Sequence, residues 1–182
     1  MKRFRFYHTP VVLIILMFLT ATYSCKKSDE VKQSFTVNNL VASKASYGAT
    51  RVDANLVNGW GIAFSPSGNA WISAEDAGVS VVYDKTGAQV LAPVSIPSPT
   101  ASNGGSPSGQ VYNSTTDFLL LNGNPAKFIF AGTDGVISAW NTGSAAERKV
   151  NRSATSAYTG LANGANGANN YIYAADFKSK KI

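Results

Sequence analysis

The chain has 182 residues, of which 45% are hydrophobic and 14% are charged, and its formal net charge is +6. The excess positive charge lies near the two ends, because residues 33–177 contain 7 Lys and Arg against 8 Asp and Glu. Binding to nucleic acid requires a clustered basic surface that neutralises phosphates, so this distribution argues against a nucleic-acid partner.

The N-terminus has the pattern of an export signal. Lys2, Arg3 and Arg5 precede the continuous apolar run Val11–Leu19. This run is much shorter than the roughly 20 apolar residues of a membrane-spanning helix. A positive segment followed by a short apolar run is typical of a signal peptide, which we expect over residues 1–24.

The only cysteine of the chain follows this leader directly, in the sequence Thr22-Tyr23-Ser24-Cys25. The sequence resembles a lipobox, the site at which bacterial lipoproteins are cleaved and lipidated on cysteine, although Thr22 replaces the usual leucine. The resemblance implies a lipid on Cys25, a membrane partner, and an outer-membrane or cell-surface location. An ordinary signal peptide with an incidental cysteine, or an uncleaved anchor, is the alternative. The polar residues 25–34 are expected to form a flexible tether.

Apolar residues alternate with polar ones from Trp60 onward, which predicts an all-β body of short strands joined by turns. A loop over 98–108 and a long hairpin tip over 163–170 interrupt the pattern. The expected strands are Gly61–Phe64, Ala70–Ala74, Val79–Tyr83, a proline-interrupted strand within 90–96, and an extra strand at Phe118–Leu121.

A glycine followed by a short apolar strand recurs at Gly61, Gly109 and Gly160, which are 48 and 51 residues apart. Spacings of about 40–50 residues are typical of β-propeller blades, although four such strands also fit one sheet of a sandwich. Glycine at this place lets the innermost strand of a blade approach a crowded central channel. An aromatic-Ile-x-Ala strand also recurs, at 71–74, 128–131 and 171–174. The approximate blades are 58–97, 106–150 and an incomplete 157–182.

The run Asn55–Pro66, NLVNGWGIAFSP, is similar to the opening of an uncharacterised family of exported bacterial β-propeller proteins. Residues 134–140 (DGVISAW) and 158–162 (YTGLA) match that family as well. The family belongs loosely with six-bladed propellers of the NHL and gluconolactonase type. The resemblance implies a partial β-propeller over 35–182, with about three of six blades. Family members are longer, so the chain is expected to be an N-terminal fragment.

Propellers place ligand sites at one mouth of the central channel, where the inner strands begin. Asn55, Asn58 and Trp60 precede or open the first inner strand and are therefore the candidate ligand-binding residues. For Trp60, and for Trp71 further along, a role in core packing or in packing between blades competes with a role as a platform for a sugar ring.

An acidic residue follows each aromatic-Ile-x-Ala strand, namely Glu75, Asp134 and Asp176. Calcium-dependent lactonases of similar fold use carboxylate and amide oxygens as ligands at the channel mouth, as a hard cation requires. The three residues, together with Asp76, are thus candidate calcium ligands. The competing interpretation is a structural role in turns, since Asp134-Gly135 is a favoured hairpin turn.

Two functions follow from these features. The first is an envelope-anchored binding module without catalytic activity, whose ligand is a glycan, a peptide or a protein. The alternative is a calcium-dependent hydrolase of the lactonase type, with its site completed by missing blades. The only histidine is His8 in the leader, so the body of the chain holds no Ser-His-Asp or Cys-His system and no His-rich zinc site. The calcium-dependent hydrolase is supported by fold-level analogy alone, so the binding module is the favoured function.

Overall fold

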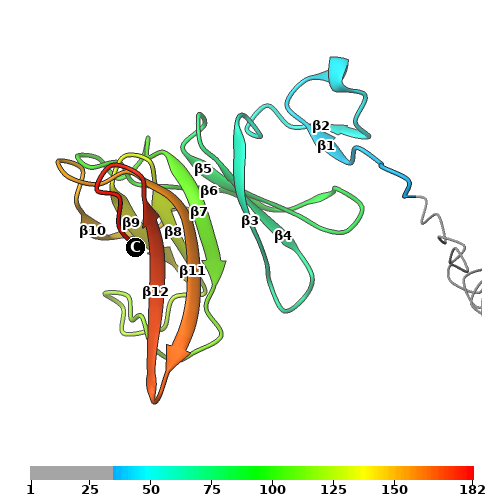
Figure 1. The fold of residues 1–182 in the computed structure, drawn as a ribbon. Coiled ribbons are helices and arrows are strands. Elements are labelled where there is room, and N and C mark those ends of the chain that lie inside the picture. Colours follow the sequence, from blue (N-terminus) through cyan, green and yellow to red (C-terminus); the bar gives the residue numbers. More distant parts are fainter. Residues whose placement is uncertain (1–34) are drawn as a thin grey trace, which may run out of the picture. The chain divides into compact units, whose positions relative to one another are not determined.

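A computed structural model of the chain describes residues 35–182 (Figure 1). The predicted signal peptide over 1–24, the tether over 25–34 and the lipidation site Cys25 lie outside the described residues. Residues 38–182 form one compact unit, which contains the hydrophobic clusters described below and so carries its own core. Within the described part of the chain, no helix has the length and apolar character needed to cross a membrane.

The unit is an all-β structure made of several sheets, none of which closes on itself, and this confirms the predicted fold class at that level. Two four-stranded antiparallel sheets follow the chain order of their strands, and a long hairpin comes after them. The first sheet consists of β3 (Gly59–Phe64), β4 (Ala70–Ala74), β5 (Val79–Tyr83) and β6 (Gln89–Ser95). The second sheet consists of β7 (Pro107–Tyr112), β8 (Phe128–Gly132), β9 (Val136–Trp140) and β10 (Glu147–Asn151). The hairpin consists of β11 (Tyr158–Asn166) and β12 (Asn169–Asp176).

A small N-terminal element precedes the first sheet. It contains the parallel strands β1 (Val41–Ala42) and β2 (Arg51–Val52), with the short 3-10 helix Ala45–Tyr47 between them. Leu40 and Val41 lie against Gly87 in the turn between β5 and β6, so this element is fixed to one end of the first sheet.

The hydrophobic core has two layers, one on each face of the second sheet. Between the first and second sheets, the Trp71 ring stacks on Phe128 with ring centres 3.9 Å apart and also meets Trp140. Between the second sheet and the hairpin, Ile129 and its neighbours pack against Leu161. Because both faces of the second sheet are covered, β8 and β9 are buried along their whole length. Their sequences are therefore nearly continuous apolar runs.

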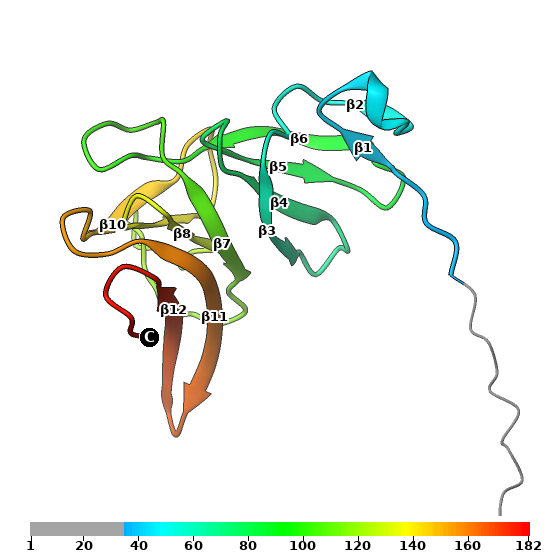
Figure 2. The same cartoon turned by 45° about the horizontal axis from the view of Figure 1, so that its top comes forward.

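The first strands of the two sheets and of the hairpin, β3, β7 and β11, lie side by side (Figure 2), and we call them the inner strands. A Cβ added at Gly61 would lie 2.7 Å from the Ser108 carbonyl oxygen, and one added at Gly109 would lie 2.7 Å from the Leu161 nitrogen. Real Cβ atoms do not approach other atoms so closely, so glycine is required at both places. The crowding expected at these glycines therefore comes from the backbone of the next inner strand.

Polar side chains also join the inner strands. The buried Gln110 amide of β7 donates to the Gly61 carbonyl at 3.2 Å and to the Trp71 carbonyl. The Ser108 hydroxyl donates to the Tyr158 carbonyl of β11 at 2.6 Å. These bonds satisfy polar groups that would otherwise be buried without a partner.

The aromatic-Ile-x-Ala repeat does not mark equivalent positions in the three sheets. Two residues after each inner-strand glycine, Ala63 pairs with Trp71, Val111 with Ile129, and Ala162 with Tyr173. The residue that pairs at this position is thus the first of segment 71–74, the second of segment 128–131 and the third of segment 171–174. The pairing between the first and second strands has a register shift at or just before each glycine. Such an irregularity moves the later pairs by one position, so segments that align in sequence do not occupy equivalent places in the sheets.

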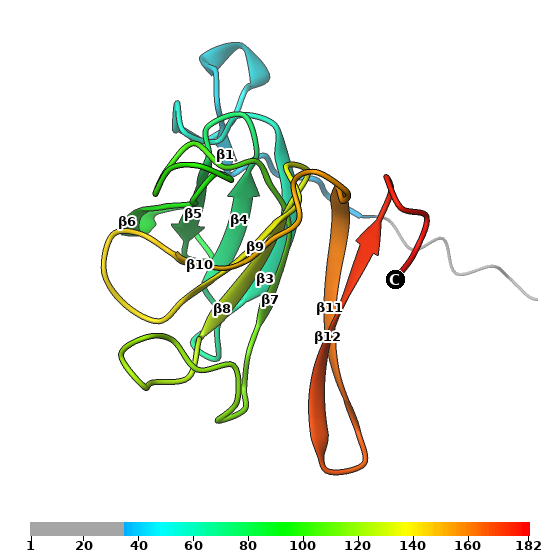
Figure 3. The same cartoon turned by 90° about the vertical axis from the view of Figure 1, so that its left-hand side faces the viewer.

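Two local predictions are wrong. Phe118–Leu121 is not a strand, because Phe118 has a φ of 60° and only Leu119 forms a bridge, to Pro125. The supposed tip over 163–170 is mostly regular strand, since β11 and β12 pair as far as Asn166 and Asn169 and leave a two-residue turn (Figure 3). The asparagines and glycines of this segment favoured a turn, but the pairing of β11 with β12 extends through most of them.

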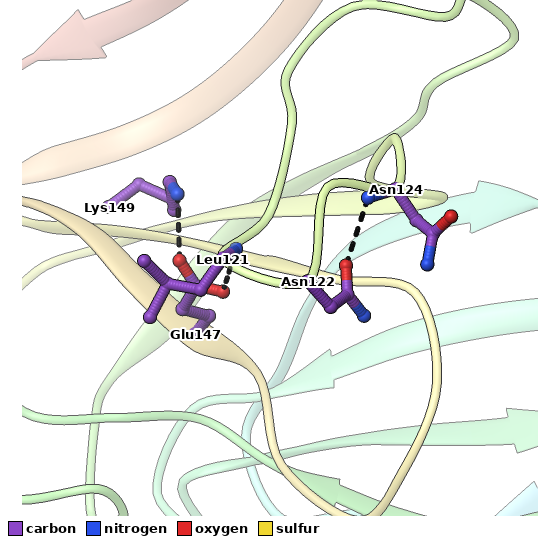
Figure 4. Close-up of polar contacts among 5 residues, drawn as sticks. All are labelled: Leu121, Asn122, Asn124, Glu147 and Lys149. Atoms are coloured by element: carbon purple, nitrogen blue, oxygen red, sulfur yellow. Dashed lines mark hydrogen bonds and ion pairs between the residues drawn. The ribbon is translucent and has the colours of Figure 1, made fainter.

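The segment between β7 and β8 is held as a loop by side chains. The Asn113 amide donates to the Asp117 and Ala126 carbonyls at 3.1 and 2.8 Å. Glu147 of β10 accepts a hydrogen bond from the Leu121 nitrogen at 2.9 Å and forms an ion pair with Lys149 at 2.7 Å (Figure 4). These contacts fix the loop against the outer edge of the second sheet.

Candidate functional site

Five polar or aromatic residues meet at the end of the sheets where β3 begins, and we call them the rim cluster. They come from the start of β3, from the turn between β4 and β5, and from the turn between β8 and β9. The five are Asn58, Trp60, Glu75, Asp76 and Thr133.

Asn58 is the centre of the rim cluster. Its amide nitrogen donates to Glu75 Oε2 and to Asp76 Oδ1, each at 3.1 Å, and its Oδ1 accepts from Trp60 Nε1 at 3.1 Å. Glu75 Oε1 accepts from the Thr133 hydroxyl at 2.8 Å. A hydrogen-bonded chain therefore runs from an indole in the first sheet to a hydroxyl in the second.

The local backbone explains why Asn58 can serve three partners. Its φ is 51°, in the left-handed region that asparagine tolerates better than most residues. Its carbonyl accepts from the Glu75 nitrogen at 3.1 Å, so the backbone fixes the two segments before the side chains meet. The amide is thus held between two carboxylates and an indole.

Trp60 and Trp71 have different roles. Trp71 is 5% exposed and belongs to the core, as the packing interpretation expected. Trp60 is not part of this core, because 48% of this residue is exposed although its N–H is hydrogen-bonded. An exposed indole with a fixed orientation offers a flat apolar surface beside polar groups.

Asn55, the third predicted ligand-binding residue, is engaged elsewhere. Its backbone and side-chain nitrogens donate to Asp53 Oδ1 at 2.8 and 3.1 Å, and the Tyr83 hydroxyl donates to Asp53 Oδ2 at 2.6 Å. Burial raises the pKa of Asp53, but the hydrogen bonds from Tyr83 and Asn55 outweigh it, and the pKa lies below its ordinary value. Burial and the same carboxylate raise the pKa of Tyr83. Asn55 therefore stabilises the segment that precedes β3.

The four candidate calcium ligands lie within two residues of the end of the second strand of each four-stranded sheet and of the hairpin, as expected, but their side chains point to different partners. Glu75 belongs to the rim cluster. Asp134 accepts from the Val136 and Ser106 nitrogens at 3.1 and 3.3 Å. Asp176 accepts from the Ala157 nitrogen at 3.0 Å. Within residues 35–182 no group of three acidic, His or Cys side chains is placed to hold a metal ion, so the four candidates do not fit a shared calcium site.

Asp134 and Asp176, the two candidate calcium ligands outside the rim cluster, have opposite pKa shifts. Burial raises the pKa of Asp134 above its ordinary value, against the effect of the backbone hydrogen bonds. The Ser179 hydroxyl, together with backbone N–H groups that include that of Ala157, lowers the pKa of Asp176 despite its burial. Both carboxylates fix turns, as the structural interpretation of these residues proposed.

Sequence reasoning brought forward Asn58, Trp60, Glu75 and Asp76, but it missed Thr133. Nothing in the spacing links Thr133 to Asn58, because the two lie 75 positions apart in different repeat units. Thr133 could have been predicted from its position beside Asp134-Gly135, because this turn follows the second strand of its sheet as the turn with Glu75 does. Turns at equivalent places in neighbouring repeats lie at the same end of the stack.

Comparisons of this chain with protein-family models, with curated proteins and with solved structures found no match. The site is therefore interpreted from its own geometry.

Proposed function

We propose that this chain is an exported, lipid-anchored binding protein of the β-propeller type, and that its rim cluster binds a neutral, hydroxyl-rich ligand such as a glycan. The observation that carries the proposal is the exposed Trp60 indole, held by the Asn58 amide beside the carboxylates of Glu75 and Asp76.

The chemistry of the rim cluster suits a sugar. The face of Trp60 provides an apolar surface on which a pyranose ring packs, and carboxylate oxygens accept hydrogen bonds from hydroxyl groups. Each carboxylate of Glu75 and Asp76 uses only part of its acceptor capacity on Asn58 and Thr133. Two neighbouring negative charges disfavour an anionic ligand, so acidic glycans are not expected to bind.

The arrangement of the sheets supports the propeller part of the proposal. The sheets and the hairpin follow each other in chain order, each pairs its strands in sequence, and the first strand of each lies innermost. A rim cluster at the starting end of β3 is then at a channel mouth, the usual position of a propeller ligand site.

Binding to a panel of neutral oligosaccharides tests the proposal, with residues 35–182 and isothermal titration calorimetry as the readout. Trp60→Ala removes the stacking surface and is expected to weaken binding at least tenfold. Asn58→Gly keeps the positive φ, removes the amide and is expected to weaken binding as well. Phe177→Ala, which changes an exposed aromatic residue outside the rim cluster, is the matched control and is expected to bind like the unmodified protein.

Two outcomes would contradict the proposal. Equal binding by the Trp60→Ala and Phe177→Ala proteins would place the ligand elsewhere. Calcium-dependent thermal stabilisation with turnover of lactones would favour the hydrolase alternative, for which the fold resemblance is the only support.

The anchoring part of the proposal has a separate test. Cells that express the full chain are expected to incorporate labelled fatty acid into it, and Cys25→Ala is expected to abolish the label. Export with no lipid on the unmodified protein would leave an ordinary secreted binding protein.

A further inference from the structure

The rim cluster uses all its side-chain hydrogen-bond donors internally. The two hydrogens of the Asn58 amide nitrogen go to carboxylates, one to Glu75 and one to Asp76, at 3.1 Å each. The single N–H of the Trp60 indole goes to Asn58 Oδ1, and the Thr133 hydroxyl donates to Glu75 Oε1. The carboxylates add no donor, since an ionised carboxylate only accepts. No side-chain N–H or O–H of the rim cluster therefore remains for a ligand.

The orientation of the Asn58 amide is fixed by its partners. The reverse orientation would place its oxygen against the carboxylates of Glu75 and Asp76. It would also place the amide nitrogen, a donor, against the Trp60 N–H. Because neither contact would be a hydrogen bond, the network forms with the amide hydrogens toward the carboxylates and in no other way.

Backbone donors of the same turns are engaged as well. The Glu75 nitrogen donates to the Asn58 carbonyl at 3.1 Å, and the Gly78 nitrogen donates back to the Glu75 carbonyl at 3.1 Å. In the second sheet, the Thr133 nitrogen donates to the Ser106 carbonyl at 2.9 Å. These bonds fix the segments that carry the carboxylates and the hydroxyl.

Acceptors of the rim cluster, in contrast, remain free. A carboxylate has about four acceptor positions. The cluster side chains fill two of these positions on Glu75 and one on Asp76, at Oδ1. Asp76 Oδ2 receives no hydrogen bond from the described residues, and both Asp76 and Trp60 are exposed. Asp76 Oδ2 is therefore the principal acceptor for a ligand that packs on the indole.

A site whose side chains only accept distinguishes between the functional groups of sugars. A hydroxyl group donates to a carboxylate, whereas a carbonyl oxygen cannot, and it would lose its hydrogen bonds to water without replacement. An N-acetylated sugar carries such a carbonyl where an unmodified hexose has a hydroxyl. The rim cluster is therefore expected to bind the two kinds of sugar differently.

We propose that the rim cluster selects glycans of unmodified hexose units, whose hydroxyl groups donate to Asp76 and Glu75, and disfavours N-acetylated units. The inference rests on the proposed function, because it names the class of glycan that the same site binds. Asp76 determines the specificity. Asn58 is a positioning residue, since its amide holds the carboxylates and has no hydrogen left for the ligand.

The test compares ligands that differ only by an N-acetyl group in place of a hydroxyl, with residues 35–182 and isothermal titration calorimetry. Cellotetraose, a glucose tetramer, and chitotetraose, its N-acetylglucosamine counterpart, form one pair. Lactose and N-acetyllactosamine form another. In each pair, the unmodified member is expected to bind about tenfold more tightly.

Asp76→Asn tests which residue sets this preference. The amide keeps an oxygen for the hydrogen bond from Asn58 and carries an N–H donor in place of the free acceptor. This donor can meet an N-acetyl carbonyl, so the preference within each pair is expected to fall to about threefold or less. Asp117→Asn is the matched control, because Asp117 is an exposed carboxylate in the loop between β7 and β8, outside the rim cluster. It is expected to keep the full preference.

Three outcomes would overturn the proposal. Equal or tighter binding of the N-acetylated members, weakened by Trp60→Ala, would contradict the selectivity and leave the proposed function intact. A preference that Asp76→Asn does not change would show that this carboxylate does not determine it. If no member of either pair binds, the selectivity is contradicted, and the wider panel of neutral oligosaccharides decides the proposed function separately.

Discussion

At the scale of residues, the join between the first and second sheets depends on a buried amide. Gln110 accepts hydrogen bonds from the Ser73 and Ser80 hydroxyls at 3.3 and 3.1 Å while it donates to two carbonyls of the first sheet. All its hydrogen-bonding groups are thus used. Such a satisfied buried amide specifies which strands lie opposite each other, which an apolar contact does not.

Replacing this amide tests that role. Gln110→Leu keeps the approximate volume but leaves the Ser73 hydroxyl and two carbonyls without their partner, and we expect a loss of about 1–3 kcal/mol in the free energy of unfolding. Ser138→Ala is the matched comparison, because the buried Ser138 hydroxyl has no hydrogen-bond partner among the described residues. Its removal is expected to leave stability unchanged or to raise it. Urea titration measures both, and a larger loss for Ser138→Ala would contradict the account.

Asp176 gives a prediction about pH. Its lowered pKa means that the ionised form is favoured in the folded state, so its contribution to stability is present above the unfolded pKa of about 4 and is lost as the pH falls toward the folded value. Asp176→Asn is therefore expected to destabilise the protein at pH 7 and to differ less from the unmodified protein at pH 3. A difference that stays constant across this range would show that the carboxylate charge has no such role.

At the scale of elements, the strands of the first sheet follow from the sequence more closely than the rest. Ala70–Ala74 and Val79–Tyr83 have the bounds that alternation predicted, because short turns of Gly, Asp and Ser limit them on both sides. Phe118–Leu121 failed because an apolar run alone does not show that a partner strand is available. Its residues instead lie in a loop that the Asn113 amide fixes on either side, through the Asp117 and Ala126 carbonyls.

The loop between β7 and β8 can be tested through this asparagine. Asn113→Ala removes hydrogen bonds to the Asp117 and Ala126 carbonyls, and the Asn113 Oδ1 no longer accepts from the Thr115 nitrogen. We expect faster amide hydrogen exchange over residues 114–126, with β8 and β9 unchanged, because the loop opens without the core. Asn122→Ala, which removes only a local bond to the Asn124 nitrogen, is the control. Unchanged exchange in the Asn113→Ala loop would contradict this account.

At the scale of the whole molecule, the sequence predicted an all-β chain and a repeated glycine, but not how the repeats meet. The spacing of Gly61, Gly109 and Gly160 marked the three inner strands, and at Gly61 and Gly109 the next inner strand leaves no room for a larger residue. The faces of the second strands could not be assigned, since the irregularities next to the glycines shift the register by one position. The rim cluster was predicted in part, since the sequence pointed to all its members except Thr133, whose link to the others depends on how two sheets stack.

The central claim is that the sheets are stacked through glycines whose Cβ position is occupied by the next inner strand. The most direct test is the free energy of unfolding of Gly61→Ala, Gly109→Ala and Gly160→Ala, measured at a concentration where the protein is a single chain. The account predicts a loss of about 1–3 kcal/mol for each of the first two, from overpacking against backbone. It predicts no loss, or a gain of about 0.4–1 kcal/mol, for Gly160→Ala. Equal effects of the three substitutions would contradict it.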